Sequence, residues 1–158
     1  MLKTPAHELI AHFARASHEG DLLASHRNAY GLLAIGYDHT DSACEGQRID
    51  AAKADELLEH DVARIRDQIV LPKLPPRVQR ELNENQLAAL ISFAHSISRK
   101  VWADSCVWAR VATRRYVDVP AELLKHSRHD GRTLRVLTRR RLSEANLFCS
   151  FPGWLVPP

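Results

Sequence analysis

Apolar side chains near the start of the chain fall on one helical face. Three of them recur at helical spacing: Leu9, Ile10 and Phe13. Thr4 followed by Pro5 is a helix-start signal, because threonine can cap free backbone N–H groups and proline loses no hydrogen bond at the first helical position. Gly20 suits the left-handed position just beyond a helix. The pattern therefore predicts a first helix that ends at Glu19.

The pattern changes between residues 21 and 45. Short apolar pieces alternate with residues that favour turns, namely Asn28, Gly31, Gly36, Asp38 and Asp41. This alternation is typical of a small irregular hairpin or a three-stranded sheet. We expect a β lobe at about residues 19–48.

Helical spacing returns after Asp50, which can cap a helix. Apolar residues then recur at spacings of four, three and four, at Leu58, Val62, Ile65 and Ile69. The run LPKLPP, residues 71–76, cannot continue this helix, because proline lacks the backbone N–H and restricts the residue before it. We expect a long helix and then a hinge or linker.

Further helices are predicted to start at Asn83, at Ser105, at Asp118 with Pro120, and at about Thr133. The order is one helix, a small β region and about five more helices. This predicts an α+β fold with a helical lobe at about residues 76–150. We expect one domain over residues 1–158, with a cleft between the lobes.

Composition excludes some classes of protein. The 158 residues are 45% hydrophobic and 26% charged, which are ordinary globular values. No apolar run approaches the ~20 residues of a transmembrane helix, and we expect no signal peptide in the first residues. The net charge of +3 suits an anionic polymer such as a cell wall or a nucleic acid. Three cysteines without CxxC spacing favour free thiols, and nine histidines form no recognisable ligand pattern, so we expect no metal and no cofactor.

Glu19 is the strongest candidate for chemistry. Hydrolysis of a glycosidic bond needs a carboxylic acid that protonates the leaving oxygen, and usually a second carboxylate or a positioned water on the other face of the sugar. Burial between lobes and the negative end of a helix dipole would both raise the pKa of a glutamate at a helix end. Taken alone, however, Glu19 is also compatible with an ordinary helix-end residue.

The run EGDLLASHRNAYGLLAIGYDHT, residues 19–40, resembles the phage lysozymes of glycoside hydrolase family 24. In that family a helix-end Glu-Gly is followed by a hairpin that ends in a G-Y-G-H-T-like string, and this chain has Gly36, Tyr37, His39 and Thr40 there. Three later segments are also similar to the family, in order and spacing. They are Gly46, Ile49, Ala54, Leu57, Leu58 and Asp61; then Gln86, Ala89, Leu90, Ser92, Phe93 and Ala94; then Arg140, Arg141, Glu144, Leu147 and Phe148.

The resemblance implies a lysozyme-like fold and a muramidase that cleaves the β-1,4 bond between N-acetylmuramic acid (MurNAc) and N-acetylglucosamine (GlcNAc). Glu19 would be the acid, and peptidoglycan would be the partner of a protein that we expect to be a monomer. We expect such a protein to be made in the bacterial cytoplasm and to act at the cell wall or periplasm once released. A nucleic-acid-binding role is disfavoured, because no groove-reading motif or aromatic-interleaved basic stripe is present.

The departures from the family lie in the catalytic set. Asn28 and Ala34 stand where the family has its Asp and Thr, while Asp38 replaces a glycine. His95, Ser96, Ser98 and Val136 depart from the family pattern too. Asn28 keeps the shape of an aspartate but cannot be a general base, and Ala34 lacks the hydroxyl that would help to hold a water.

Two explanations follow. The enzyme works with Glu19 and a differently supplied water or another carboxylate, or the chain keeps the cleft as a binding module with most catalysis lost. The other carboxylates are Asp21, Asp38 and Asp41. Loss of a general base typically removes ~10²–10⁴ of rate.

Other residues have simpler interpretations. His39 and Thr40 are candidates for a supporting role, and a hydrogen-bonded structural residue is the favoured interpretation of His39. Asn28 is a turn former or a contact for sugar or water. Trp102, Trp108 and Trp154 are expected in the core or between lobes. The charged run RTLRVLTRRR is expected on a solvated helix face, although the arginines that match the family also suit structural salt bridges or attraction to the cell wall.

Overall fold

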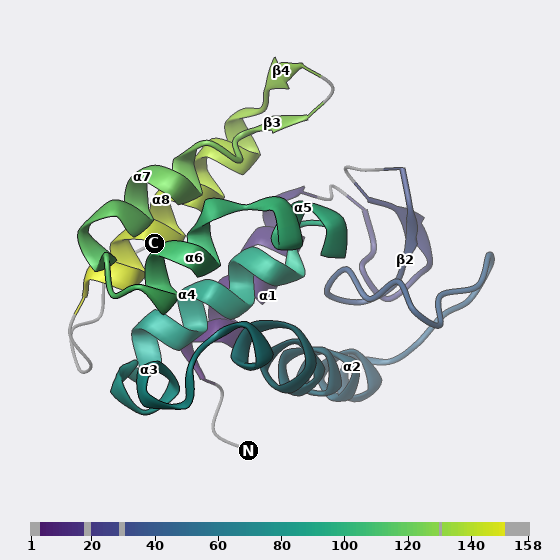
Figure 1. The fold of residues 1–158 in the computed structure, drawn as a ribbon. Coiled ribbons are helices and arrows are strands. Elements are labelled where there is room, and N and C mark those ends of the chain that lie inside the picture. The colour runs from purple at the N-terminus through teal and green to yellow at the C-terminus, as the bar shows by residue number, and fades with distance from the viewer. Residues whose placement is uncertain (1–3, 18–19, 29–30, 130, 151–158) are drawn as a thin grey trace.

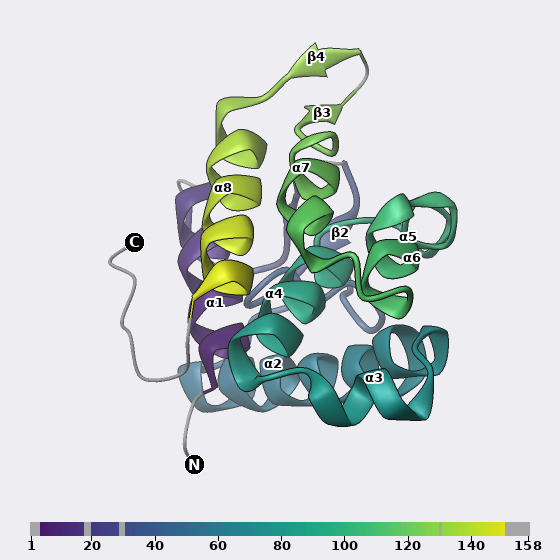
Figure 2. The ribbon, with the colours of Figure 1, turned by 60° about the vertical axis from the view of Figure 1, so that its left-hand side comes forward.

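A central helix, α4, organises the fold. The computed structural model describes residues 4–17, 20–28, 31–129 and 131–150. Within them, α4 (Glu84–His95) packs against α1 (Pro5–Ser17), α2 (Ala51–Ile65) and α8 (Arg135–Cys149) (Figure 1, Figure 2). Residues 88–94 of α4 are all buried, as expected for a helix that is surrounded on most sides.

Two predicted helix caps are confirmed. The Asn83 side chain accepts a hydrogen bond from the Gln86 backbone N–H at 2.9 Å, and the Gln86 side chain accepts one from the Asn83 N–H at 3.1 Å. The Asp50 carboxylate accepts a hydrogen bond from the Lys53 N–H at 2.7 Å, at the start of α2. Each cap satisfies backbone N–H groups that have no partner inside the helix.

The helix after Asp50 continues beyond α2. A π-helical turn, η1 (Arg66–Val70), and a 3₁₀ turn, η2 (Leu71–Lys73), lead to α3 (Pro76–Glu81). The predicted linker over residues 71–76 is therefore wrong in part. Pro72 and Pro76 occupy the first turns of helical segments, where the missing N–H costs no hydrogen bond.

The other helices are short. α5 (Arg99–Asp104), α6 (Cys106–Ala112), the 3₁₀ turn η3 (Tyr116–Asp118) and α7 (Val119–Leu124) precede α8. The predicted starts at Ser105 and Asp118 are confirmed, because these residues directly precede α6 and α7. The sequence did not indicate α5, since this helix of six residues has no periodic apolar pattern and, unlike α7, no proline at its start.

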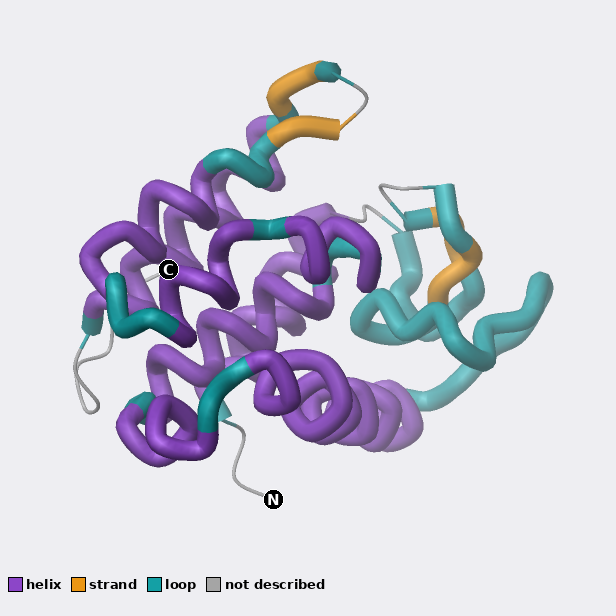
Figure 3. Tube along the Cα trace, in the orientation of Figure 1, coloured by secondary structure: helices purple, strands orange, loops and turns teal. Residues whose placement is uncertain are grey.

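The strands form two small hairpins (Figure 3). β1 (His26–Arg27) pairs with β2 (Leu33–Ala34) in antiparallel register, and isolated bridges join Ala24 to Arg48 and Ile35 to His39. This irregular hairpin confirms the predicted β region and the α+β fold class. The second hairpin, β3 (Arg128–His129) with β4 (Arg132–Thr133), corrects the expectation that strands lie only near the N-terminus.

Buried charges tie α8 to α4. Glu144 is fully buried and forms ion pairs with Arg140 at 3.2 Å and with Arg141 at 2.9 Å. Ser92 of α4 donates a hydrogen bond to the Glu144 carboxylate at 2.8 Å, and Arg141 donates one to Ser96. The prediction of a solvated face is wrong for these two arginines, because their carboxylate partner lies inside the fold. Arg140 and Arg141 instead form the structural salt bridges that were the alternative expectation.

The side-chain positions of the cysteines and tryptophans follow the remaining expectations where they are described. Cys44, Cys106 and Cys149 are free thiols. Trp102 is buried, with its ring centroid 5.9 Å from that of Phe93. Trp108 is half-buried, and Trp154 lies outside the described residues. Among the described helices, none combines the length and apolar character that a membrane crossing requires.

Candidate functional site

A cavity of about 630 Å³ lies between the first hairpin and the helices. Asn28, Leu32, Asp38 and Thr40 line it from the hairpin region. The opposite side is formed by the end of α4, the start of α5 and the segment after α7, through His95, Ser96, Ile97, Ser98, Val101, Lys125, His126 and Arg128. The volume is typical of a ligand-binding cleft.

Asn28 stands at the end of β1 and closes the hairpin turn. Its side-chain oxygen accepts a hydrogen bond from the Leu32 N–H at 3.0 Å, and its backbone carbonyl accepts one from the Gly31 N–H at 2.9 Å. The turn needs Gly31, whose φ of +74° lies in the left-handed region. The Asn28 amide then donates a hydrogen bond to the Asp38 carboxylate at 2.8 Å. Asn28 is therefore both a turn former and part of the cleft wall.

Asp38 is held by a tight turn between Ile35 and His39. The backbones of these two residues exchange hydrogen bonds at 2.9 and 3.0 Å. Asp38 has a φ of +71°, a left-handed conformation that is uncommon outside glycine, although aspartate and asparagine are the residues that tolerate it best. The turn aims the carboxylate toward Asn28 and into the cleft.

His39 lies beneath the cleft wall. Its Nδ1 lies 2.8 Å from the Asp61 carboxylate of α2, and its Nε2 lies 2.9 Å from the Ser42 hydroxyl. The hydrogen bond with Asp61 raises the pKa of His39 against the opposing effect of burial. Burial opposes ionisation of Asp61, but the hydrogen bond with His39 lowers the pKa of that carboxyl below its usual value. Nδ1 thus ties the turn to α2, and Nε2 ties it to Ser42 in the segment that follows the turn.

Thr40 and Ala34 occupy different environments. Thr40 is exposed and lines the cleft. Ala34 is fully buried in β2, opposite His26, and lines neither the large cavity nor the smaller one beside it. Glu19 lies outside the described residues.

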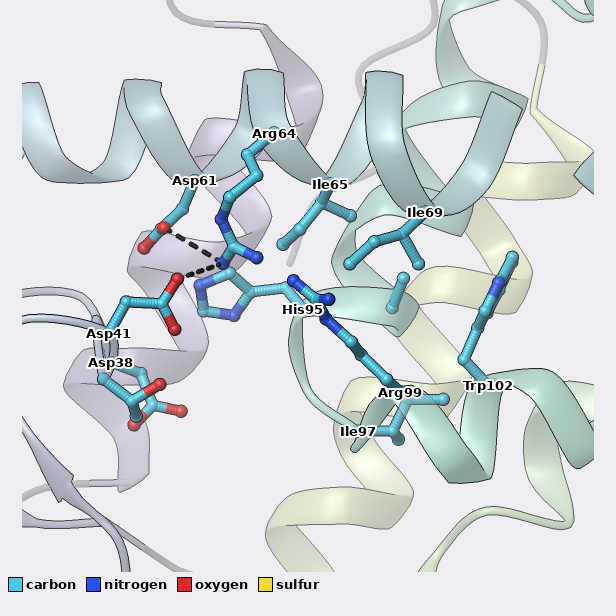
Figure 4. A pocket seen from close by; sticks show the side chains of 12 residues that line it. Asp38, Asp41, Asp61, Arg64, Ile65, Ile69, His95, Ile97, Arg99 and Trp102 are labelled. Carbon is cyan, nitrogen blue, oxygen red and sulfur yellow. Dashed lines mark hydrogen bonds and ion pairs between the residues drawn. The ribbon is translucent and has the colours of Figure 1, made fainter. Parts of the chain in front are cut away.

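The smaller cavity, of about 150 Å³, adjoins the cleft (Figure 4). Figure 4 shows Asp61, Arg64, Ile65 and Ile69 reaching into it from the helical segment that begins with α2, with Asp38 and Asp41 on the hairpin side. Arg64 bridges Asp61 at 3.3 Å and Asp41 at 3.4 Å. Asp38, Thr40 and His95 line both cavities, so the two spaces share a wall.

His95 and His126 stay uncharged near neutral pH. Burial lowers the pKa of His95 to about 4, with a further contribution from the positive charge of Arg140. Burial also lowers the pKa of His126, whose ring packs edge-on against Phe93 at 5.0 Å between centroids. The cationic groups of this wall are therefore Lys125 and Arg128, both exposed.

The large cleft thus has one carboxylate, Asp38, on the hairpin side and two exposed cations, Lys125 and Arg128, on the other side. The sequence pattern singled out Asn28, Asp38 and His95, but it did not indicate Lys125, His126 or Arg128 as cleft residues, because residues 125–128 carry no motif. Within the described ranges, no group of three or more histidine, cysteine, aspartate or glutamate side chains gathers as a metal site would require.

Comparison with known proteins settles the family. The family model described as phage lysozyme matches residues 16–144. The chain belongs to the phage lysozyme family. A search of curated protein sequences finds no match.

Solved structures share the lysozyme fold. The muramidase domain of SpmX from Asticaccaulis excentricus is 30% identical, with a TM-score of 0.69 over 95% of this chain and 98% of that one. A variant of the phage P22 lysozyme is 26% identical, with a TM-score of 0.70 over 95% of this chain and 100% of that one. The endolysin of the Escherichia coli O157:H7 phage FAHEc1 has a TM-score of 0.72 at 22% identity, over 94% and 93% of the two chains. These likenesses confirm the predicted lysozyme-like α+β fold.

Proposed function

We propose that this lysozyme family member is a peptidoglycan N-acetylmuramidase that hydrolyses the MurNAc–GlcNAc β-1,4 bond. The observation that carries the proposal is the cavity of about 630 Å³ between hairpin and helices, with hydrogen-bonding groups on both walls. A sugar chain needs such a cleft, with a few polar groups that fix its orientation. Family membership supports the same reaction class.

Glu19 would protonate the leaving oxygen in this reaction. The support is its place in the Glu-Gly that begins the family-like run of residues 19–40. The test is the release of soluble fragments from purified peptidoglycan, with reducing ends identified by mass spectrometry. We expect MurNAc reducing ends from the wild type and a rate at least ~10²-fold lower for Glu19→Gln, the scale of general acid catalysis.

The matched control is Glu8→Gln, the same chemical change at an exposed position of α1. It should leave the rate unchanged. A wild type that releases no fragments, or a Glu19→Gln variant that works as fast as the wild type, would contradict the proposal.

Recognition without cleavage is the second candidate function. It is favoured by Asn28, which cannot take a proton from water, and by the buried methyl group of Ala34, which offers no hydroxyl to the cleft. Cosedimentation with insoluble peptidoglycan separates the two candidates. Binding without fragment release, equal in the wild type and Glu19→Gln, favours the binding module.

A further inference from the structure

The carboxylate that is absent from position 28 is present on its hydrogen-bond partner. We propose that Asp38 is the general base of the cleft, an inference that rests on the proposed muramidase function. Two departures from the family pattern, Asn28 in place of Asp and Asp38 in place of glycine, are in direct contact. The pair therefore retains one carboxylate, which lies in the turn after β2 instead of at the end of β1.

The geometry leaves Asp38 available for a water. Its Oδ1 accepts the Asn28 amide at 2.8 Å, while its Oδ2 has no hydrogen-bond partner within the described ranges. Asp38 is half-buried and lines both cavities, at the wall that they share. One oxygen thus anchors the side chain and the other faces space that a water and a sugar can occupy.

The backbone gives independent support. Asp38 adopts a φ of +71°, where a side chain costs conformational energy that glycine avoids. Strained backbone of this kind persists where the surrounding structure fixes it and is enriched at functional sites. A carboxylate at this position is therefore placed in the cleft at a cost to stability.

The other two candidate carboxylates are engaged elsewhere. Asp21 accepts the Leu23 N–H at 2.9 Å and pairs with Arg48 at 2.7 Å, and it lines neither cavity. Asp41 pairs with Arg64 at 3.4 Å and lines only the smaller cavity. Asp38 is the one of the three that lines the large cleft.

The reaction in the cleft would be an inverting hydrolysis by one water molecule. Asp38 takes a proton from water while the water oxygen bonds to the anomeric carbon and the glycosidic C–O bond breaks. The leaving oxygen receives a proton from the acid, assigned to Glu19. The Asn28 amide holds the Asp38 carboxylate in place, which makes Asn28 a positioning residue.

The test compares Asp38→Asn and Asp38→Gly with Asp41→Asn as the matched control. Both Asp38 variants should lower kcat at least about hundredfold. Their peptidoglycan binding should persist, and Asp41→Asn should cleave like the wild type. Asp38→Gly removes the carboxylate without adding backbone strain, because glycine adopts a positive φ freely. The double variant Asn28→Asp with Asp38→Gly returns the carboxylate to position 28 and should regain rate over Asp38→Gly alone.

A pH profile distinguishes a base from a structural residue. In Asp38→Asn the fall of kcat/KM toward low pH, which reports the base, should disappear. The fall toward high pH, which reports the acid, should remain. The charged and titratable groups that line the two cavities with Asp38 are Asp41, Asp61, Arg64, His95, Arg99, Lys125, His126 and Arg128. Cleavage by Asp38→Asn at the wild-type rate, or an unchanged acidic limb, overturns the role of Asp38 alone. A wild type that does not cleave overturns the proposed function and this role together.

Discussion

Replacement of Asp61 by asparagine tests the buried pair beneath the cleft wall. The side chains of His39 and Asp61 are only 5% and 4% exposed, and the distance from His39 Nδ1 to Asp61 Oδ2 is 2.8 Å. Removal of one partner of a buried ion pair costs about 3–5 kcal/mol, because the other charge stays buried without compensation. We therefore expect Asp61→Asn to lower the free energy of unfolding by about 3–5 kcal/mol near pH 5.

The pH dependence of this loss has a definite sign. The pKa of His39 is raised above 6.5, so its contribution is complete below pH 6.5 and is lost as the pH rises through the folded-state pKa. The pKa of Asp61 is lowered below 3.8, so its contribution is present above pH 3.8 and is lost as the pH falls through the folded-state value. The loss in Asp61→Asn should thus be largest between these pH values. It should fall toward about 1.5–3 kcal/mol as the pH rises through the folded-state pKa of His39, because a neutral His39 still donates a hydrogen bond to a carboxylate.

Urea unfolding at pH 5, 7 and 9, followed by circular dichroism, measures this difference. Asp67→Asn is the control, because Asp67 is an exposed carboxylate on the same run of helix and pairs with Arg66 at the surface. It should change stability by less than about 0.5 kcal/mol at each pH. A loss in Asp61→Asn that is the same at all three pH values, or that grows toward pH 9, would refute the reasoning.

Three more predictions concern the scaffold. Glu144→Gln should lower stability by about 3–5 kcal/mol in thermal unfolding, because two buried arginines lose their carboxylate; a change below ~1 kcal/mol would show that the arginines find other partners. Asn83→Ala should cost about 1 kcal/mol through loss of the α4 cap, against little change for the exposed Asn146→Ala, and equal effects of the two would contradict the capping argument. Ala34→Thr should cost about 1–3 kcal/mol by overpacking a fully buried site, and unchanged urea unfolding would show that the hairpin has room for the larger side chain.

Features that depend on neighbouring residues could be predicted from the sequence. The caps at Asp50 and Asn83 follow from contacts three residues along the chain, so the residue types alone indicate them. The apolar faces of the longer helices are likewise local patterns. The second hairpin could not be found, because its short strands, β3 and β4, contain no apolar residue that would mark a buried side.

Features that depend on distant contacts could not be predicted. The burial of Arg140 and Arg141 is set by packing against α4 as well as by Glu144 four and three residues away. Asn28 and Asp38 were each recognised as departures from the family pattern, but their contact spans ten residues and a turn. The basic wall at Lys125 and Arg128 depends on how the segment after α7 lies across the cleft from the hairpin.

Gly36 joins the cleft wall to the first turn of α2. It has a φ of +62°, and a Cβ added there would lie 3.4 Å from the Cβ of Ala54 in α2. The space between the first turn of α2 and the turn that carries Asp38 and His39 therefore has room for about one methyl group. A side chain larger than that at Ala54 would press on this turn, so variants that alter the shape of the groove can be sought at a residue that lines neither cavity.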